Sequence, residues 1–399
     1  MKRVYLDCAA TTYVDGGVLE AMLPYFSEEF GNANSLHSFG LRAEKAVVEA
    51  RSKIAGIINA KPVEIYFTSG GTEADNWAVK GVAGAHSKKG KHIITSSVEH
   101  HAVFDTCKDL EKKGFEVTYL PVDKEGTIDL GALKAAIRPD TILVSIMYAN
   151  NEIGTVMPIK EAVKIVRERQ EKGQKIYFHT DCVQAAGALE LNVADLGVDL
   201  MSVSAHKFYG PKGIGFLYVK NGVKLERLMT GGNQERNIRG GTTNVPGVVG
   251  MAKAFELAAQ RMQKNNERVG KLRDKFVERV LAEIDGVYLN GSRANRLPNN
   301  ANLSFEYIEG EGMVYGLDSE GVAVSTGSAC SSGSLDPSHV LLALGIPVGL
   351  ANCTLRFSFG KDNTEEDVDY AVEKLKKVVK RLRDMSPLFN QLPSEKFKV

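Results

Sequence analysis

The sequence predicts an α/β fold with a mostly parallel sheet, followed by a smaller α+β domain. Three observations support this: a length of 399 residues, an alternation of short apolar runs with helical patterns up to about residue 255, and a change of rhythm near Pro246. A chain of this length is expected to form two domains, or one large domain with a companion. Alternating strands and helices are typical of βαβ units, whose sheet is covered on both faces.

The first part of the chain alternates regularly. Helical spacing predicts helices at 44–58 and 73–82. Short runs rich in β-branched and aromatic residues predict the strands between the helical stretches. These predicted strands are 63–67, 92–95, 116–120, 141–147, 175–179, 199–204 and 215–219.

Beyond Pro246 the pattern predicts a helix over 248–284, longer than most globular helices and suited to connect two domains. Fewer strands follow, and a last helix is expected before a tail at 386–399 that contains two prolines. The predicted elements here are strands at 301–305, 322–325 and 354–358 and a helix at 365–385.

Composition excludes several classes of protein. Apolar residues make up 43% and charged residues 25%, which is ordinary for a globular chain and unlike a disordered one. Lys+Arg number 50 and Asp+Glu 49, a balance that argues against a direct nucleic-acid or membrane-surface role. No apolar run could span a bilayer, and Asp7 interrupts any signal-type core, so we expect a cytoplasmic protein. Five cysteines without a Cys-x-x-Cys pair predict neither a disulfide framework nor a structural metal site.

A glycine-rich turn follows the strand at 63–67, in the run Thr68-Ser69-Gly70-Gly71-Thr72-Glu73. Backbone N–H groups at a helix N-terminus suit a phosphate, and the glycines allow it to approach. The alternative is an ordinary βα turn in which glycine serves the geometry.

Candidate catalytic or cofactor-binding residues follow two further predicted strands. Asp181 closes the apolar strand at 175–179, where an acid can pair with a protonated ring nitrogen, or can simply cap a helix. Lys207 follows the strand at 199–204 and precedes a glycine-rich turn. A desolvated lysine can form a Schiff base with an aldehyde, whereas the alternative is a surface lysine at a strand end.

Three more positions are candidates because of the residues that surround them in the sequence. Either His100 or His101 could stack on an aromatic ring or move protons, but adjacent residues point in different directions, so at most one faces the site. Cys330 lies among small polar residues, which favours a mobile loop over a core position and is compatible with either a nucleophilic thiol or an idle surface one. Arg356, inside an apolar strand, indicates either carboxylate recognition or a structural ion pair.

The chain resembles the pyridoxal-phosphate-dependent cysteine desulfurases of the NifS/IscS type, in the class V aminotransferase superfamily. The resemblance covers nearly the whole chain and is carried by specific motifs: Thr68-Ser69-Gly70-Gly71-Thr72-Glu73, Asn150-Asn151-Glu152-Ile153-Gly154, Ser204-Ala205-His206-Lys207 and Gly327-Ser328-Ala329-Cys330-Ser331. It implies the PLP-dependent transferase fold type I, with a mostly parallel seven-stranded sheet in a large PLP-binding domain, 15–255. It also implies a small α+β domain, 1–14 and 256–385, that carries the mobile cysteine loop.

The resemblance assigns roles to individual residues. Lys207 would hold pyridoxal 5'-phosphate, Asp181 would pair with the ring nitrogen, Gln184 would contact the ring hydroxyl and His100 would stack on the ring. Asn151 and Arg356 would bind the substrate carboxylate, and Asn151 would also contact the cofactor. The phosphate would be held by Gly71, Thr72, Ser204, His206 and, reaching across from a neighbouring subunit, Thr242.

The implied reaction converts L-cysteine to L-alanine and leaves the sulfur on Cys330 as a persulfide, with Lys207 or His100 moving protons. The implied partners are a second copy of the chain in a homodimer and an iron–sulfur scaffold protein or another sulfur acceptor, with tRNA thiolation a further destination. No resident metal is implied, although Cys330 could ligate a cluster transiently. The alternatives are a selenocysteine lyase, a class V aminotransferase, or a sulfur-transfer scaffold that lacks the cofactor.

Two departures from the family pattern stand out. Cys182 follows the site aspartate where the family usually has alanine, and it is expected to be inert packing or a second thiol that captures sulfur. Asn352-Cys353-Thr354 replaces a histidine followed by small residues, which removes any role of that histidine but not of Arg356.

Overall fold

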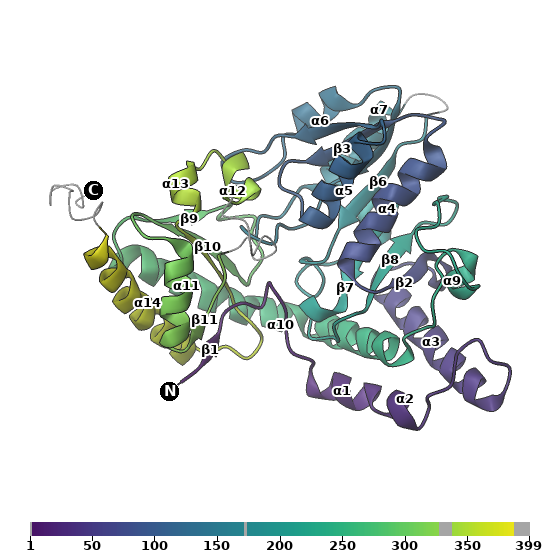
Figure 1. Cartoon of the computed structure of the whole chain (residues 1–399), viewed down its shortest axis with the longest axis horizontal. Helices are drawn as coiled ribbons and strands as arrows, with labels where there is room; N and C mark the ends of the chain where they lie inside the picture. The colour runs from purple at the N-terminus through teal and green to yellow at the C-terminus, as the bar shows by residue number, and fades with distance from the viewer. Residues whose placement is uncertain (1, 171–173, 327–336, 387–399) are drawn as a thin grey trace.

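The computed structural model of the chain describes residues 2–170, 174–326 and 337–386 (Figure 1). Its strands are β1 Val4–Tyr5, β2 Ile65–Thr68, β3 His92–Ser96, β4 Glu116–Leu120, β5 Thr141–Ser145, β6 Tyr177–Asp181, β7 Leu200–Ser204, β8 Gly215–Val219, β9 Val287–Asn290, β10 Asn300–Phe305, β11 Val322–Ala323 and β12 Thr354–Ser358. Its α-helices are α1 Gly16–Met22, α2 Pro24–Ser27, α3 Ser38–Ile57, α4 Gly71–His86, α5 His101–Glu111, α6 Leu130–Ala136, α7 Ile159–Arg169, α8 Val193–Leu196, α9 Gln234–Asn237, α10 Val245–Glu283, α11 Gly310–Ser319, α12 His339–Ala343, α13 Val348–Ala351 and α14 Glu365–Met385. Short 3-10 turns lie at Pro62–Glu64 and Ala205–Lys207.

The main sheet has seven strands in the order β2-β8-β7-β6-β5-β3-β4. The five strands from β7 to β4 pair in parallel, and β8 runs antiparallel to both β7 and β2. Every residue of β3, β5, β6, β7 and β8 is buried, as expected when helices cover both faces of a parallel sheet. The prediction of a mostly parallel α/β sheet is therefore confirmed.

A smaller unit surrounds a three-stranded antiparallel sheet in the order β12-β10-β9, beside the parallel pair β1-β11. Helices α11 and α14 pack near these strands (Figure 1). The smaller unit has its own apolar core, and the first residues of the chain contribute Val4 and Leu6 to it.

Helix α10 joins the two units (Figure 1). Its 39 residues correspond to about 58 Å of helix at 1.5 Å per residue. The N-terminal half contributes Met251 and Phe255 to the core beneath the large sheet, and the C-terminal half contributes Phe276 and Val280 to the core of the smaller unit. The helix begins with Pro246 in its first turn, where proline removes no hydrogen bond.

The predicted elements agree with the structure in kind and differ mainly at their ends. Three predicted ranges, 116–120, 215–219 and 354–358, match strands β4, β8 and β12, and the helix at 365–385 matches α14. The strand expected at 63–67 begins only at Ile65, because Pro62 starts a 3-10 turn there. The strand expected at 322–325 forms only Val322–Ala323, which pairs with the two-residue strand β1, while Ser325 makes an isolated bridge to Arg356.

Candidate active site

The carboxyl ends of the large sheet's parallel strands meet at one edge, and the candidate residues follow those ends. Gly71 follows β2, His100 follows β3, Asn151 follows β5, and Lys207 follows β7, while Asp181 is the last residue of β6. Ligands of open α/β sheets bind at this edge, because the loops there converge. The strand order thus brings together residues that are far apart in the sequence.

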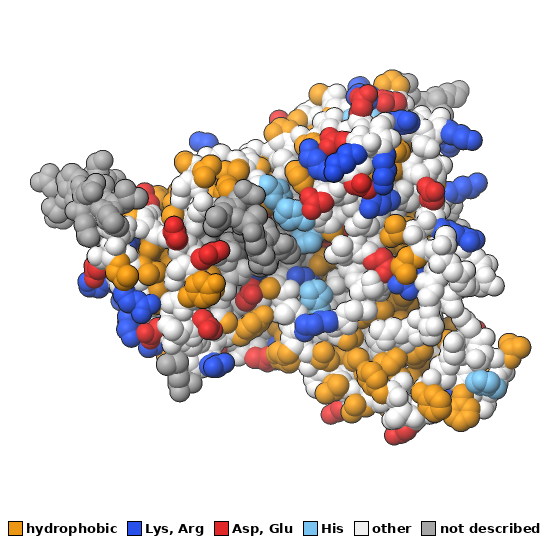
Figure 2. Space-filling view, in the orientation of Figure 1, with side chains coloured by type: hydrophobic (Ala, Val, Ile, Leu, Met, Phe, Trp, Pro, Cys, Tyr) orange, Lys and Arg blue, Asp and Glu red, His pale blue; other side chains and the backbone are white. Residues whose placement is uncertain are grey.

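These loops enclose a hollow of about 1030 Å³, which we call the central cavity. It is lined by Ala9, Ala10, Gly71, Thr72, Asp75, His100, Met147, Asn151, Asp181, Val183, Gln184, Ser204, His206, Lys207 and Arg356. All residues predicted for the cofactor and substrate within one subunit therefore line a single space. In the view of Figure 2, histidine side chains gather near the middle of the molecule.

The glycine-rich turn lies at the N-terminus of the 16-residue helix α4. A Cβ at Gly71 would lie 2.7 Å from Cγ2 of Val183, so only glycine lets the turn pack this closely beneath the cavity. Thr72, Ser204 and His206 line an adjoining hollow beside Gly71. Hydroxyl groups and free helix N–H groups at this point form a suitable cradle for a phosphate.

Lys207 projects from the turn after β7. Its Nζ donates hydrogen bonds to the carbonyl oxygens of Ala9 (2.7 Å) and Ala10 (2.8 Å), both in the N-terminal segment. Gln184 Nε2 donates to the same Ala9 carbonyl, at 3.0 Å. The first residues of the chain thus form one wall of the cavity, a contribution that the sequence did not reveal.

Asp181 is buried, and its Oδ1 accepts a hydrogen bond from the backbone N–H of Val183 at 2.8 Å. Burial raises the pKa of Asp181 to about 6, while the Val183 N–H and the charge of Lys207 act in the opposite direction. No helix begins at Asp181, so the alternative of a helix cap is wrong.

His100 lines the cavity, whereas His101 does not. His100 caps α5, and its Nδ1 accepts a hydrogen bond from the N–H of Ala102 at 3.1 Å. Burial, followed by the nearby charge of Lys207, lowers the pKa of His100 to about 4. His101 instead stacks edge-on against His339, with ring centroids 4.9 Å apart. The expectation that only one of the pair faces the cavity is correct.

Arg356 lies in β12 of the smaller unit and lines the cavity from the opposite side. Its Nη1 donates to the carbonyl of Asn151 at 3.0 Å, and its Nη2 pairs with Asp7 at 2.9 Å. Arg356 therefore takes part in an ion pair, as one interpretation predicted, and it also lines the cavity, while its recognition of a carboxylate stays a prediction.

Thr242 does not line the central cavity. It lies in a separate groove with Ser69 and Gln234, beside Arg239. The guanidinium of Arg239 contacts both carboxylate oxygens of Glu73, at 2.7 and 2.9 Å, and so holds this segment against the glycine-rich turn.

The cysteines are distributed as follows. Cys330 lies outside the described residues. Cys182 is fully buried, and burial raises its pKa well above the usual value, which fits inert packing. Cys353 is partly exposed, and its thiol donates to the carbonyl of Gly349.

Sequence reasoning missed the buried polar residues beneath the cavity. Asp75 lies on α4 and is 1% exposed, Glu99 precedes His100 and is 0% exposed, and His179 on β6 is 0% exposed. Each lies within three residues of a position that the sequence did single out: Thr72, His100 and Asp181 respectively. Only His179, which follows the apolar run Ile176-Tyr177-Phe178, gave a signal in the sequence, because Asp75 and Glu99 have mostly polar or small neighbours.

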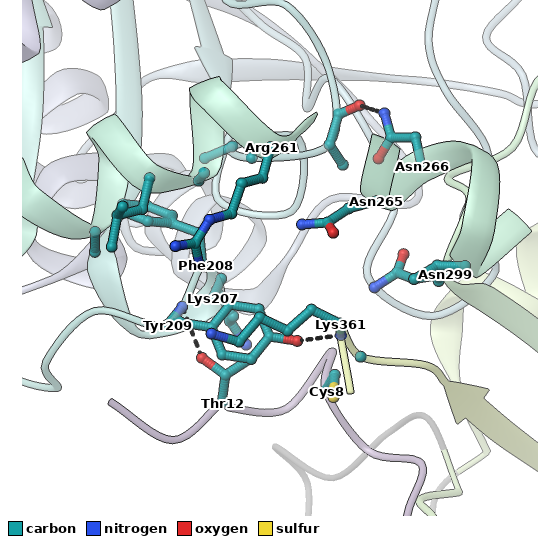
Figure 3. A pocket seen from close by; sticks show the side chains of 18 of the residues that line it. Cys8, Thr12, Lys207, Phe208, Tyr209, Arg261, Asn265, Asn266, Asn299 and Lys361 are labelled. Atoms are coloured by element: carbon teal, nitrogen blue, oxygen red, sulfur yellow. Dashed lines mark hydrogen bonds between the residues drawn. The ribbon is translucent and has the colours of Figure 1, made fainter. Parts of the chain in front are cut away.

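A second cavity lies behind Lys207, where the two units meet (Figure 3). Arg261 and Asn265 of α10 reach into it from one side, and Asn299 and Lys361 from the smaller unit reach into it from the other. It shares only Lys207 and Gln184 with the central cavity among the predicted site residues, which separates it from the glycine-rich turn and the acids.

The central cavity suits pyridoxal 5'-phosphate by the chemistry of its side chains. An amine (Lys207) and an acid (Asp181) line the same space as an imidazole (His100), and the N-terminus of α4 opens into it at Gly71. These groups match, in order, an aldehyde, a ring nitrogen, a flat ring face and a phosphate.

Comparison with known proteins places the chain among enzymes of related chemistry. The sequence pattern described as "Aminotransferase class-V" matches residues 4–371. The chain is 57% identical over 388 residues to "Cysteine desulfurase IscS" of Dictyoglomus turgidum, with 97% of each chain covered. It is 54% identical to the protein of the same name from Methanosarcina thermophila, covering 97% of this chain and 94% of that one.

Solved structures agree. A "NIFS-LIKE PROTEIN" superposes with a TM-score of 0.90 at 40% identity, covering 96% of this chain and all of that one. The structure titled "SspA in complex with cysteine" gives a TM-score of 0.79 at 36% identity, covering 91% of this chain and all of the other. Within the described part of the chain, no helix has both the length and the apolar character needed to cross a membrane.

Proposed function

The chain belongs to the class V aminotransferase family, and from this premise we propose that it is a pyridoxal-phosphate-dependent cysteine desulfurase. It converts L-cysteine to L-alanine and passes the sulfur to Cys330 as a persulfide. The observation that carries the proposal is the convergence of Lys207, Asp181 and the glycine-rich turn on one cavity, in a chain more than half identical to curated desulfurases.

The cofactor, when bound, supplies an electron-accepting ring that takes up the negative charge formed on the substrate. Lys207 holds the cofactor through its amine, and Asp181 pairs with the ring nitrogen. Gln184 faces the ring hydroxyl. The turn at Gly71 and Thr72, together with Ser204 and His206, holds the phosphate.

Proton movement falls to Lys207 rather than to His100. The Ala102 N–H occupies Nδ1 of His100, so the proton of the neutral ring sits on Nε2. With a pKa near 4, this ring stays neutral at physiological pH and has no nitrogen available to take up a proton. His100 therefore stacks on the ring and donates from Nε2, while the Lys207 amine accepts the proton from the substrate and returns it.

The substrate carboxylate binds at Arg356 and Asn151. The guanidinium is held in place by Asp7 and by the Asn151 carbonyl, so its orientation is set before substrate arrives. With the carboxylate and the amine of L-cysteine held, its sulfur is presented to the Cys330 thiolate. That thiolate attacks the sulfur, the carbon–sulfur bond breaks and its electron pair stays with the carbon, which then takes up a proton from Lys207 and becomes the alanine methyl group.

The enzyme acts as a homodimer that shares its phosphate sites through Thr242. Thr242 lies outside its own subunit's cavity and is held by the Arg239–Glu73 pair, which suits a reach toward a second copy. Large apolar side chains are exposed in the N-terminal part of the chain, at the lower right of Figure 2. They include Leu23, Phe26, Phe30, Leu36 and Phe39, with Phe26 61% and Leu36 93% exposed. Sedimentation of the purified protein tests this: a dimer that Phe26→Asp and Leu36→Asp together dissociate is expected, and a wild-type monomer would contradict it.

The sulfur acceptor is an iron–sulfur scaffold protein or a comparable cytoplasmic partner. This part of the proposal is based on the family resemblance. It is tested by following labelled sulfur from Cys330 to candidate acceptor proteins.

Peptide mass mapping after incubation with L-cysteine, without reductant, tests the function. One extra sulfur on the peptide that carries Cys330, together with alanine, is expected. Cys330→Ala is expected to keep the cofactor spectrum and lose desulfuration, and Lys207→Ala to lose both cofactor attachment and turnover. Cys353→Ser is the matched control and should behave as wild type.

Other outcomes separate the alternatives. Alanine without sulfur on Cys330 would indicate a lyase that releases sulfur or selenium directly. Sulfur on Cys182 in the Cys330→Ala variant would make Cys182 the acceptor, and no alanine at all would exclude the desulfurase.

A further inference from the structure

A cluster of ionisable side chains forms the floor of the central cavity, with two members lining it and two buried behind them, and we call it the floor cluster. It consists of Asp75 on α4, Glu99 after β3, and His179 and Asp181 on β6. All four are at least 95% buried. Three carboxyl groups and one imidazole are thus removed from water together, and like charges this close in a desolvated site cannot all be ionised.

The hydrogen bonds around the cluster show which acid keeps its charge. Asp181 receives the Val183 N–H, and the Lys207 ammonium lies close enough to stabilise its anion. Asp75 Oδ1 has no hydrogen-bond partner among the described residues, and its nearest cationic candidate, Nε2 of His179, is 3.6 Å away. An ionised carboxylate with an unsatisfied buried oxygen is costly, whereas a neutral acid carries a proton there.

His179 cannot neutralise Asp75 by taking a proton itself. Its Nδ1 contacts the Ser145 hydroxyl at 2.8 Å and its Nε2 the Ser202 hydroxyl at 2.9 Å. A neutral imidazole satisfies both contacts, with one nitrogen donating and the other accepting. Burial lowers the pKa of His179 to about 3, which agrees with a neutral ring.

Glu99 follows the same pattern. Its Oε1 accepts from the Ser96 hydroxyl (2.5 Å) and the Met147 N–H (3.0 Å), while Oε2 has no partner in the described part of the chain. Burial raises the pKa of Glu99 to about 8. Burial, and then the charge of Asp181, likewise raises the pKa of Asp75 well above its ordinary value.

We propose that Asp75 is a positioning residue held as a neutral acid beneath the cavity, and that its proton confines the single negative charge of the floor cluster to Asp181. The inference rests on the proposed function, in which Asp181 pairs with the protonated ring nitrogen. A single negative charge on Asp181 lies next to the protonated ring nitrogen and stabilises it directly. An anion at Asp75 would instead divide the negative charge of the cluster between two carboxylates. Asp75 acts through Asp181 and exchanges no atom with the substrate.

Infrared spectroscopy of the cofactor-loaded protein, prepared with ¹³C-labelled aspartate, tests the proposal directly. At neutral pH we expect one carboxyl band of a neutral aspartic acid, lost in Asp75→Asn and retained in the exposed matched control Asp369→Asn. Glutamate carries no label, so Glu99 does not contribute. Because no substrate is present, the result does not depend on whether cysteine is turned over.

Two further measurements keep the test decisive. The Ser202 hydroxyl also hydrogen-bonds the carboxyl group of Asp75. Ser202→Ala is therefore expected to shift the band without removing it, and this second variant keeps the test valid if Asp75→Asn folds poorly. In a pH titration of the cofactor absorbance, the wild type is expected to show one alkaline transition more than Asp75→Asn does. Absence of a neutral-aspartate band in the wild type, or its survival in Asp75→Asn, would overturn the proposal.

Discussion

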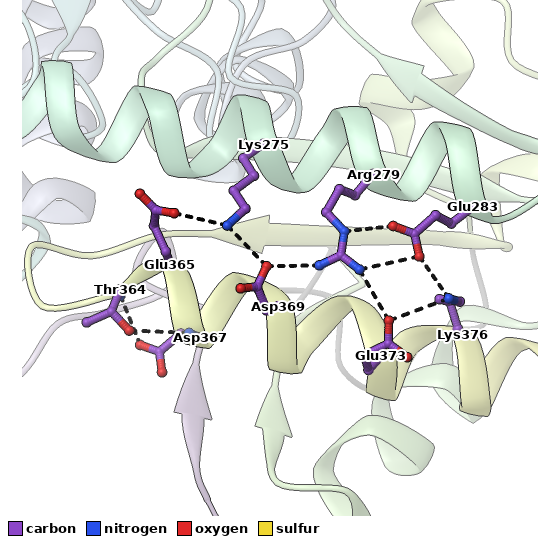
Figure 4. A network of polar contacts seen from close by, with 9 residues as sticks. All are labelled: Lys275, Arg279, Glu283, Thr364, Glu365, Asp367, Asp369, Glu373 and Lys376. Carbon is purple, nitrogen blue, oxygen red and sulfur yellow. Dashed lines mark hydrogen bonds and ion pairs between the residues drawn. The ribbon is translucent and has the colours of Figure 1, made fainter.

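The floor cluster and the interface between α10 and α14 both gather charged side chains, but they lie in opposite environments. The interface carries an ion-pair network formed by Lys275, Arg279, Glu283, Glu365, Asp369, Glu373 and Lys376 (Figure 4). Arg279 pairs with three carboxylates, those of Glu283, Asp369 and Glu373, at distances of 2.7 to 3.2 Å. In the floor cluster, by contrast, Asp75 and Glu99 each keep one buried carboxylate oxygen that has no hydrogen-bond partner among the described residues.

The difference shows what burial does to a carboxyl group. In the α10–α14 network, two hydrogen-bonding cations, first Arg279 and then Lys376, lower the pKa of the exposed Glu283 to about 2. In the floor cluster, loss of water raises the pKa of Glu99 to about 8. The same side chain is therefore an anion in one place and a neutral acid in the other at physiological pH. Exposed pairs add little stability because water and salt screen them.

The largest expected effect comes from removing the charge of Asp181. Asp181→Asn keeps the side-chain shape and should lower turnover of L-cysteine on the order of 10²-fold or more, because a preorganised charge at the ring nitrogen is lost. Asp369→Asn, the same chemical change in the α10–α14 network, should leave turnover unchanged. Steady-state alanine production measures both, and equal rates for Asp181→Asn and wild type would remove Asp181 from the site.

A second effect concerns stability against pH. Glu99 keeps its proton in the folded chain up to about pH 8, whereas the unfolded chain releases it near 4.5. The contribution of Glu99 is therefore fully present below pH 4.5 and is lost as pH rises to 8. Glu99→Gln has no such proton, so at pH 8 it should be more stable than wild type by an amount on the order of 2 kcal/mol.

Denaturant unfolding between pH 5 and 9 checks this expectation. The advantage of Glu99→Gln over wild type should grow between pH 5 and 8 and then level off. Glu373→Gln, in the exposed network, should show no such trend. A constant difference across the range would mean that Glu99 is ionised in the folded state.

A smaller effect is expected for the centre of the α10–α14 network. Arg279→Ala removes three ion pairs at once and should cost about 1 kcal/mol or less at low salt. About 1 M salt should shrink this loss, because the Debye length falls to roughly 3 Å. Urea unfolding at two salt concentrations measures the change, and a loss that salt does not reduce would assign the effect of Arg279 to packing.

The smallest effect is expected at the edge of the network. Glu365 contacts Lys275 at 3.1 Å and its side chain is 75% exposed. Glu365→Ala should leave the thermal midpoint within experimental error, because Lys275 retains Asp369 as a partner. A clear destabilisation would show that the network acts cooperatively rather than pair by pair.

Much of the fold was predictable because hydrophobic periodicity is a local property. The strands β4, β8 and β12 and the helix α14 were placed at their observed ends, since each has a strong pattern and a clear boundary. The edge strand β9 was missed because it is four residues long, with one residue exposed and two only partly buried, so its pattern is weak. Strand β1 is two residues long and exists only through its pairing with β11.

The sequence by itself determined the alternating α/β architecture, the glycine-rich turn and the candidate residues at the strand ends. These depend on side-chain chemistry and spacing within short segments. Only the tertiary structure decided that Ala9 and Ala10 wall the cavity beside Lys207, that His100 rather than His101 faces it, and that Asp75 and Glu99 lie beneath it. Burial and long-range pairing set those outcomes, and neither is encoded in a local run of residues.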